Sequence, residues 1–168
     1  MIKVAINGFG RIGKLAFRQV FEDPDMEVTT INDLTAPKML AHFLKYDSVQ
    51  GKYAGHTVEW DKKSITVDGK SIPIYAQADA RCLPWGSLGI DVVLECTGFY
   101  TSKEKAQVHI DAGAKKVLIS APAGNDQPTI VYGVNHEILK AEDNIISGAS
   151  CTINYLAPMA KVLNELNE

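Results

Sequence analysis

The sequence predicts an α/β fold, with a doubly wound, mostly parallel six-stranded sheet, helices on both faces and a small antiparallel insertion. Three observations predict it. Short apolar, β-branched runs alternate with stretches of helical spacing. Runs of alternating apolar and polar residues around Asp68-Gly69 interrupt this rhythm. A glycine-rich turn, residues 8–13, joins the first apolar run to the first helical stretch.

The composition is that of a globular domain. The 168 residues are 46% apolar and 22% charged, which suits a packed core and excludes disorder. The net charge is −3 and no basic run occurs, so no nucleic-acid partner is expected. No apolar stretch reaches the roughly 18 residues of a membrane helix. The N-terminus lacks the pattern of a signal peptide, and three cysteines are too few for a disulfide framework or a metal site. A cytoplasmic location without metal is therefore expected.

The first third of the chain reads as strand, helix, strand, helix. Residues 2–6 form a continuous apolar run typical of a buried strand, and residues 11–21 have helical apolar spacing. Residues 27–31 read as the second strand. Thr35 is the expected N-cap of the next helix, with Pro37 in its first turn.

The middle of the chain predicts antiparallel strands. Residues 57–60, 64–67 and 71–75 alternate apolar and polar side chains, and Asp68-Gly69 is a strong hairpin signal. We expect an insertion that leads into the third core strand.

The alternation of strand and helix then returns. A capping box at Thr101 to Glu104 predicts a helix that runs to about Ala112, with Gly113 ending it. The remaining predicted elements are strands at residues 91–95, 116–119 and 144–147 and an amphipathic helix at residues 154–166.

The glycine-rich turn has the spacing G-x-G-x-x-G at Gly8, Gly10 and Gly13. It follows a strand and opens a helix, as in the phosphate-binding loop of a Rossmann-type fold. Asp33 ends the second strand, where a carboxylate can accept hydrogen bonds from ribose hydroxyls and repel a 2′-phosphate. This arrangement predicts NAD rather than NADP as cofactor. The alternative is a structural glycine turn with Asp33 capping something local.

Cys151 lies between the last predicted strand and the last helix. Ligands of open α/β sheets bind at this edge, and a helix N-terminus favours a thiolate nucleophile. The spacing leaves a second interpretation open, in which Cys151 is a small buried hydrophobe. Cys96 is expected in the core, at the end of the predicted strand when that strand is extended to residues 92–96. The four histidines have no metal-ligand spacing and are expected to be structural or solvated.

Several motifs, in order along the whole chain, closely resemble phosphorylating glyceraldehyde-3-phosphate dehydrogenases. They are Asn7-Gly8-Phe9-Gly10-Arg11-Ile12-Gly13, Glu95-Cys96-Thr97-Gly98, Ile119-Ser120-Ala121-Pro122, Ser150-Cys151-Thr152-Ile153-Asn154 and Leu156-Ala157-Pro158. The sequence departs from the family signature at Ile153, where threonine is usual, and at Tyr155, where cysteine is frequent.

The resemblance implies roles for individual residues. It implies that Arg11 and Ile12 lie at the pyrophosphate of NAD and Asp33 at the adenosine ribose, and that Thr97, Gly98 and Ser120 line the cofactor cleft. It also implies that Cys151 is the nucleophile, with Ser150 and Thr152 helping to hold phosphate. By resemblance, residues 1–149 are the NAD-binding domain and residues 150–168 are the start of a catalytic domain.

The resemblance further implies a reaction and partners. The substrates would be glyceraldehyde 3-phosphate and inorganic phosphate, and the full-length enzyme would be a homotetramer. The general-base histidine and the rest of the substrate domain fall beyond Glu168, so the 168 residues alone are expected to be inactive. Alternatives are an isolated NAD-binding module without turnover, the related erythrose-4-phosphate dehydrogenase, and a purely structural protein.

Overall fold

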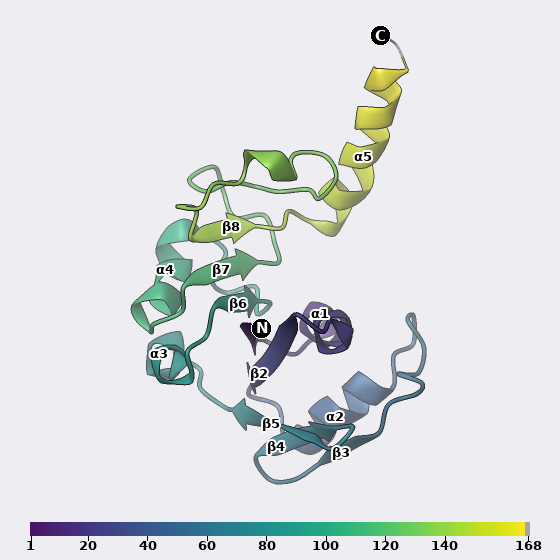
Figure 1. Ribbon diagram of the computed structural model, residues 1–168, viewed down its shortest axis with the longest axis vertical. Coiled ribbons are helices and arrows are strands. Elements are labelled where there is room, and N and C mark those ends of the chain that lie inside the picture. The colour runs from purple at the N-terminus through teal and green to yellow at the C-terminus, as the bar shows by residue number, and fades with distance from the viewer. Residues whose placement is uncertain (167–168) are drawn as a thin grey trace.

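A single sheet of eight strands organises the computed structural model, which describes residues 1–166 (Figure 1). The strands in this described part are β1 (Ile2–Asn7), β2 (Met26–Asn32), β3 (Val58–Trp60), β4 (Ser64–Val67), β5 (Lys70–Tyr75), β6 (Val92–Glu95), β7 (Lys116–Ile119) and β8 (Ile145–Ser147). The α-helices are α1 (Arg11–Glu22), α2 (Pro37–Lys45), α3 (Trp85–Leu88), α4 (Lys103–Asp111) and α5 (Cys151–Glu165), and 3₁₀ turns lie at Ala80–Cys82 and His136–Ile138.

The strand order is β3-β4-β5-β2-β1-β6-β7-β8. Every neighbouring pair from β5 to β8 is parallel, whereas β3, β4 and β5 pair antiparallel. Numbered among themselves, the six parallel strands have the order 3-2-1-4-5-6 of a Rossmann-type sheet. The predicted fold class is confirmed, and the antiparallel insertion forms one edge of the sheet.

The β4–β5 hairpin forms at the predicted turn. Val67 pairs with Lys70, which leaves a two-residue loop. Both loop residues have positive φ, 50° at Asp68 and 81° at Gly69, as a type I′ turn requires.

Helices cover both faces of the sheet (Figure 1). Successive side chains of β1 point to opposite faces, and these faces belong to different apolar clusters. Val4 and Ile6 pack with Phe17 of α1 and Leu40 of α2. Ala5, between them, packs in the cluster that contains Trp85 of α3. The predicted two-sided burial of the sheet is therefore confirmed.

Two predicted helix caps were each one residue early. The N-cap of α2 is Ala36, and the backbone N–H of Thr35 instead donates to Asp33 Oδ1 at 2.8 Å. The N-cap of α4 is Ser102, whose Oγ accepts from the Lys105 N–H at 3.2 Å. At α4, Thr101 and Ser102 are both capping residue types, whereas at α2 the cap position falls on Ala36, which makes no side-chain cap.

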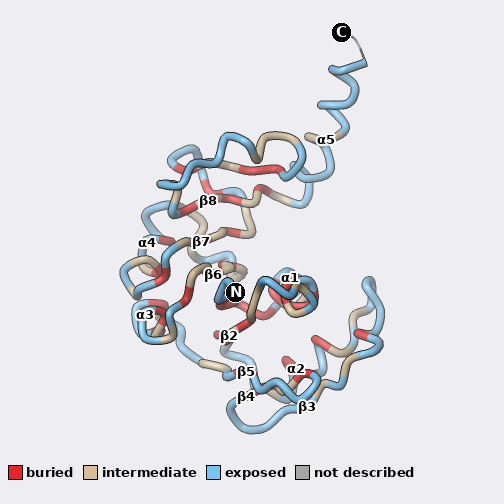
Figure 2. The backbone as a smooth tube through the Cα atoms, in the orientation of Figure 1, coloured by how far each residue is buried: buried red, intermediate tan, exposed pale blue. Residues whose placement is uncertain are grey.

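The last helix begins earlier than predicted. α5 starts at Cys151 rather than at residue 154, because the Oγ of Ser150 caps it by accepting from the Ile153 N–H at 3.1 Å. It extends away from the sheet (Figure 1), and none of its residues within the described chain is buried (Figure 2). Among residues 1–166, no helix is both long enough and apolar enough to cross a bilayer.

Candidate cofactor cleft and nucleophile loop

The carboxyl ends of the parallel strands bring the predicted site residues to one edge of the sheet. Gly8 follows β1, Asp33 follows β2, Thr97 follows β6, Ser120 follows β7 and Cys151 follows β8. Parallel strands end on the same side, and open α/β sheets bind ligands there. The topology thus gathers residues that are up to 143 positions apart (151 − 8 = 143).

The three glycines of the first loop meet different steric conditions. Gly8 has φ +90°, and a Cβ there would lie 2.8 Å from the backbone of Cys96 and Thr97. A Cβ on Gly13 would overlap the carbonyl oxygen of Gly8. Around Gly10, nothing lies within 4 Å of the Cβ position, so the backbone faces open space that a pyrophosphate could occupy.

The first turn of α1 presents backbone amides rather than side chains to this space. The first intrahelical bond runs from the Lys14 N–H to the Gly10 carbonyl at 3.1 Å, so the preceding amides of Arg11, Ile12 and Gly13 have no carbonyl within the helix to bond. The side chains of Arg11 and Ile12 are exposed and line other hollows. The N–H groups of these two residues are therefore available to a phosphate.

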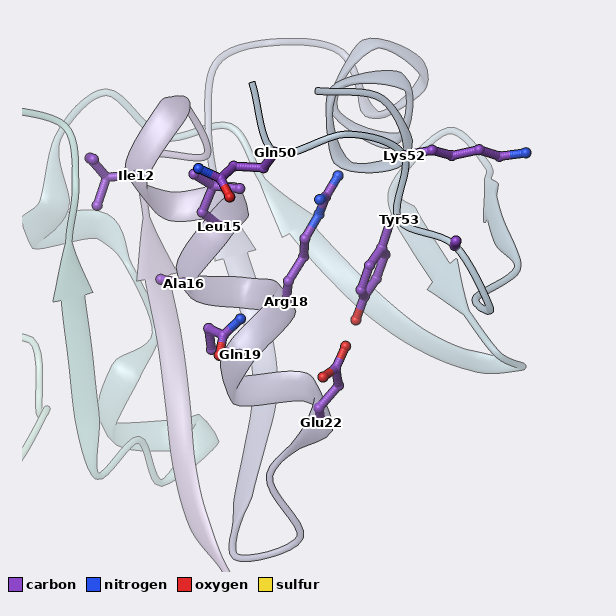
Figure 3. A pocket seen from close by; sticks show the side chains of 10 residues that line it. Ile12, Leu15, Ala16, Arg18, Gln19, Glu22, Gln50, Lys52 and Tyr53 are labelled. Atoms are coloured by element: carbon purple, nitrogen blue, oxygen red, sulfur yellow. The ribbon is translucent and has the colours of Figure 1, made fainter. Parts of the chain in front are cut away.

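Ile12 lines a separate hollow of about 660 Å³ between α1 and residues 50–54 (Figure 3). There the Arg18 guanidinium lies 4.9 Å from the centroid of the Tyr53 ring and donates to the Leu44 carbonyl at 2.6 Å. Burial and the nearby Glu22 carboxylate raise the pKa of Tyr53 to about 12. These contacts hold α1 against the end of α2 and the loop that follows α2, and they are structural.

Asp33 joins the glycine loop to the end of β2. Its Oδ2 accepts from the Phe9 N–H at 2.7 Å and its Oδ1 accepts from the Thr35 N–H at 2.8 Å. A carboxylate has about four acceptor positions, so each oxygen keeps one for a ligand. The two retained positions match the paired hydroxyls of a ribose.

A cleft of about 610 Å³ adjoins Asp33 and the glycine loop. This volume is within the range of small-molecule sites. Open space at Gly10 and unused acceptor positions on Asp33 fit the adenosine half of a dinucleotide. The lining also includes Gln77, Ala78 and Ala80, from the segment that the family resemblance places near the adenine, and five residues that the sequence reasoning missed: Asn7, Asn32, Leu34, Phe99 and Tyr100. Asn7 and Asn32 had a signal, because each is a polar residue that ends an apolar strand.

The other predicted cofactor residues are distributed unequally. Thr97 lines the cleft, whereas Gly98 and Ser120 are not part of its lining. Cys96 was expected inside a strand and in the core, but it lies just after β6, is only partly buried and lines the cleft. Burial together with the Glu95 carboxylate raises the pKa of Cys96 to about 11. Cys96 therefore stays a neutral thiol at physiological pH.

Cys151 is exposed at the start of α5, which excludes its interpretation as a buried hydrophobe. The loop before it is fixed by hydrogen bonds: Asn154 Nδ2 donates to the carbonyls of Gly148 at 2.7 Å and Ser150 at 3.0 Å. Ala149 has φ +63°, an unusual conformation for a residue with a side chain. Thr152 Oγ1 lies 3.9 Å from the Cys151 sulfur.

Comparison with known proteins gives one family. Residues 2–103 match the model of the glyceraldehyde 3-phosphate dehydrogenase NAD-binding domain. The chain is 62% identical over 165 residues to the glyceraldehyde-3-phosphate dehydrogenases of Clostridium pasteurianum and Clostridium acetobutylicum. It is 58% identical over 169 residues to that of Lactobacillus delbrueckii subsp. bulgaricus.

The matched regions cover 98% of this chain but 49–50% of each relative. The chain thus spans about half the length of the curated relatives it matches. The family model covers more than half of the chain, and it falls on the glycine loop, Asp33 and Thr97. The chain therefore belongs to the glyceraldehyde-3-phosphate dehydrogenase family and contains its NAD-binding domain.

Proposed function

We propose that the protein containing this chain oxidises glyceraldehyde 3-phosphate with NAD and phosphorylates it, with Cys151 as nucleophile. The observation that carries the proposal is the exposed Cys151 at a helix N-terminus, on the same sheet edge as the cofactor cleft. The names of the three relatives favour glyceraldehyde 3-phosphate over erythrose 4-phosphate as substrate.

In the proposed reaction, the Cys151 thiolate attacks the aldehyde carbon and forms a thiohemiacetal. NAD, when bound, would supply the hydride acceptor for oxidation of the thiohemiacetal to a thioester, and the hydroxyl proton would pass to the general base. Inorganic phosphate then displaces the Cys151 sulfur and leaves as an acyl phosphate. Ser150 and Thr152 flank Cys151 at the first turn of α5, where free N–H groups and hydroxyls favour an anion. We propose these two residues as phosphate contacts.

The proposal includes the organisation of the full protein. Residues 1–149 are the cofactor domain and residues 150–168 begin the catalytic domain, whose general base lies in sequence outside the 168 residues. The 168-residue polypeptide is therefore expected to bind NAD without turnover. A homotetramer of the full-length enzyme stays a prediction. A cytoplasmic location is supported by three free thiols, which a reducing compartment preserves.

Titration calorimetry with NAD and NADP tests the cofactor assignment. The unmodified polypeptide should prefer NAD, and Asp33→Ala should lose NAD affinity worth about 1.5–3 kcal/mol, as for hydrogen bonds to a charged group. Asp23→Ala is the matched control, because Asp23 also accepts a backbone N–H two residues on but lies at the other end of α1. Equal affinity of the unmodified polypeptide for both cofactors would contradict the assignment of Asp33.

For the catalytic assignment, Cys151→Ser in a polypeptide extended to the length of the relatives should abolish acyl-phosphate formation and leave NAD binding intact. Full activity of that variant would show that another residue is the nucleophile.

A further inference from the structure

A buried network of side-chain hydrogen bonds lies next to the cofactor cleft, and the proposed reaction does not use it. Glu95, the last residue of β6, is 1% exposed, and His109 of α4 is 0% exposed. Their side chains meet at 3.0 Å between His109 Nε2 and Glu95 Oε2. Burying a carboxylate costs free energy unless it is fully hydrogen-bonded. The groups that donate to Glu95 therefore indicate its role.

Glu95 accepts four hydrogen bonds. Its Oε2 accepts from Asn7 Nδ2 at 2.6 Å and from His109, and its Oε1 accepts from the Thr97 N–H at 2.7 Å and from the Thr97 hydroxyl. Two of the partners, Asn7 and Thr97, line the cleft. Burial alone would raise the pKa of Glu95, but the bonds from His109, Thr97 and Asn7 outweigh burial and hold the pKa below its ordinary value.

The direction of each bond follows from donors at both ends of the chain. An indole N–H can only donate, so Trp85 Nε1, at 3.0 Å, makes His109 Nδ1 an acceptor. His109 therefore carries its proton on Nε2 and donates it to Glu95. At the other end, the Gln77 N–H donates to Asn32 Oδ1 at 2.9 Å.

Asn32 transmits this orientation to the carboxylate. Its Nδ2 donates to Asn7 Oδ1 at 2.7 Å, so Asn7 turns its own Nδ2 toward Glu95. The chain thus runs from α3 through α4, β6, β1 and β2 to residue 77, and four of its members, Asn7, Asn32, Gln77 and Thr97, line the cleft. Residue 95 must therefore accept hydrogen bonds at both side-chain oxygens, as a carboxylate does.

We propose that Glu95, oriented by His109, is a positioning residue for the cofactor: it fixes Asn7 and Thr97 in the cleft before a ligand arrives. Its carboxylate holds the turn after β6 against the strand that carries the glycine loop. Preorganisation of this kind contributes affinity because the site does not have to order on binding. The inference rests on the proposed use of this cleft for NAD.

The test compares cofactor affinity with folding stability. Glu95→Gln conserves shape, but its NH₂ would face the Asn7 and His109 donors in one orientation and the Thr97 N–H in the other. We expect the dissociation constant for NAD to rise about tenfold or more, measured by calorimetry where the protein is folded. Val67→Ala is the control, because Val67 is fully buried in the antiparallel part of the sheet and takes no part in these hydrogen bonds. It should lower the urea midpoint and leave NAD affinity within about twofold.

Two further variants make the outcome decisive. Asn7→Asp combined with Glu95→Gln exchanges acceptor and donor between residues 7 and 95, and it should recover part of the lost affinity. If Glu95→Gln does not fold, Trp85→Phe removes the donor that orients His109 at a residue that does not itself line the cleft. We expect it to weaken NAD binding about threefold, as for a partial loss of orientation.

Unchanged affinity in folded Glu95→Gln would overturn the inference, as would an equal loss in Val67→Ala. With an unfolded Glu95→Gln, unchanged affinity in Trp85→Phe would do the same. Failure of the unmodified polypeptide to bind NAD would instead overturn the proposed function, so the two failures are distinguishable.

Discussion

Gly10 and Gly13 belong to one loop but meet different physical requirements. Gly13 packs α1 against the loop itself, where a Cβ would overlap the Gly8 carbonyl oxygen. Gly10 has φ −76°, which any residue can adopt, and its Cβ position is open. Its smallness matters only when a ligand is present.

Alanine at these two positions should therefore separate folding from binding. Gly13→Ala is expected to lower the free energy of unfolding by about 1–3 kcal/mol, the usual cost of overpacking. Gly10→Ala should keep the urea midpoint but weaken NAD binding. A stability loss at Gly10→Ala as large as at Gly13→Ala would contradict the division.

The three cysteines should react with iodoacetamide in a fixed order. Cys151 is exposed at a helix N-terminus, which favours its thiolate. Cys82 is exposed but does not lie at a helix N-terminus, and Cys96 has a pKa raised to about 11. We expect Cys151 to react first and Cys96 last, measured by peptide mapping after a short pulse at pH 8. Faster labelling of Cys82 than of Cys151 would show that the start of α5 does not activate its thiol.

Among the elements, helix α4 depends on a cap that the sequence placed one residue early. Both Thr101 and Ser102 are capping residue types, and the sequence motif favoured Thr101 because Glu104 follows it by three residues. In the structure the Ser102 hydroxyl accepts from the Lys105 N–H. The turn that Glu95 holds after β6 sets where the chain enters the helix, and a sequence pattern does not contain that information.

Ser102→Ala should destabilise the protein by about 1 kcal/mol, whereas Thr101→Ala should change stability by less than about 0.5 kcal/mol. Thermal or urea unfolding of both variants measures the difference. The reverse order would restore the capping box at Thr101 that the sequence suggested.

Elements defined by local chemistry were predictable from the sequence. The hairpin turn at Asp68-Gly69 needs two positive φ values, and Asp-Gly supplies them. The four-residue helix α3 was not predicted, because it has too few residues for a periodic signal and is held by contacts of Trp85 with His109. The cleft was predictable where a motif contributes residues, as at Gly8 and Asp33. Phe99 and Tyr100 reach it only through the topology.

At the scale of the whole molecule, paired carboxylates make stability depend on pH. The pKa of Glu95 lies below its ordinary value of 4.5 through hydrogen bonds that outweigh burial. The pKa of Asp47 lies far below 3.8 through bonds from the Gln50 N–H, Lys14 and the Val49 N–H. The unfolded chain therefore binds protons at a higher pH than the folded chain, and falling pH favours unfolding.

We expect the urea midpoint to be constant near neutrality and to fall from about pH 5 downward, as these groups protonate in the unfolded state first. Glu95→Gln should flatten this dependence below the ordinary pKa of 4.5, beyond any loss that it causes at pH 7. Glu137→Gln, at an exposed carboxylate, is the control and should leave the slope unchanged. The same slope in Glu95→Gln as in the unmodified polypeptide would contradict the assignment.

The central place of β1 has a consequence for synthesis on the ribosome. β1 lies between β2 and β6, and its last residue, Asn7, pairs with Glu95, 88 residues later. At about 5–20 residues per second, β1 waits roughly 4–18 s for this second neighbour. During that interval its apolar edge is open to wrong pairing, which a chaperone would have to prevent. The strand that closes this edge also brings Thr97, so NAD can stabilise the nascent chain only after β6 has paired with β1.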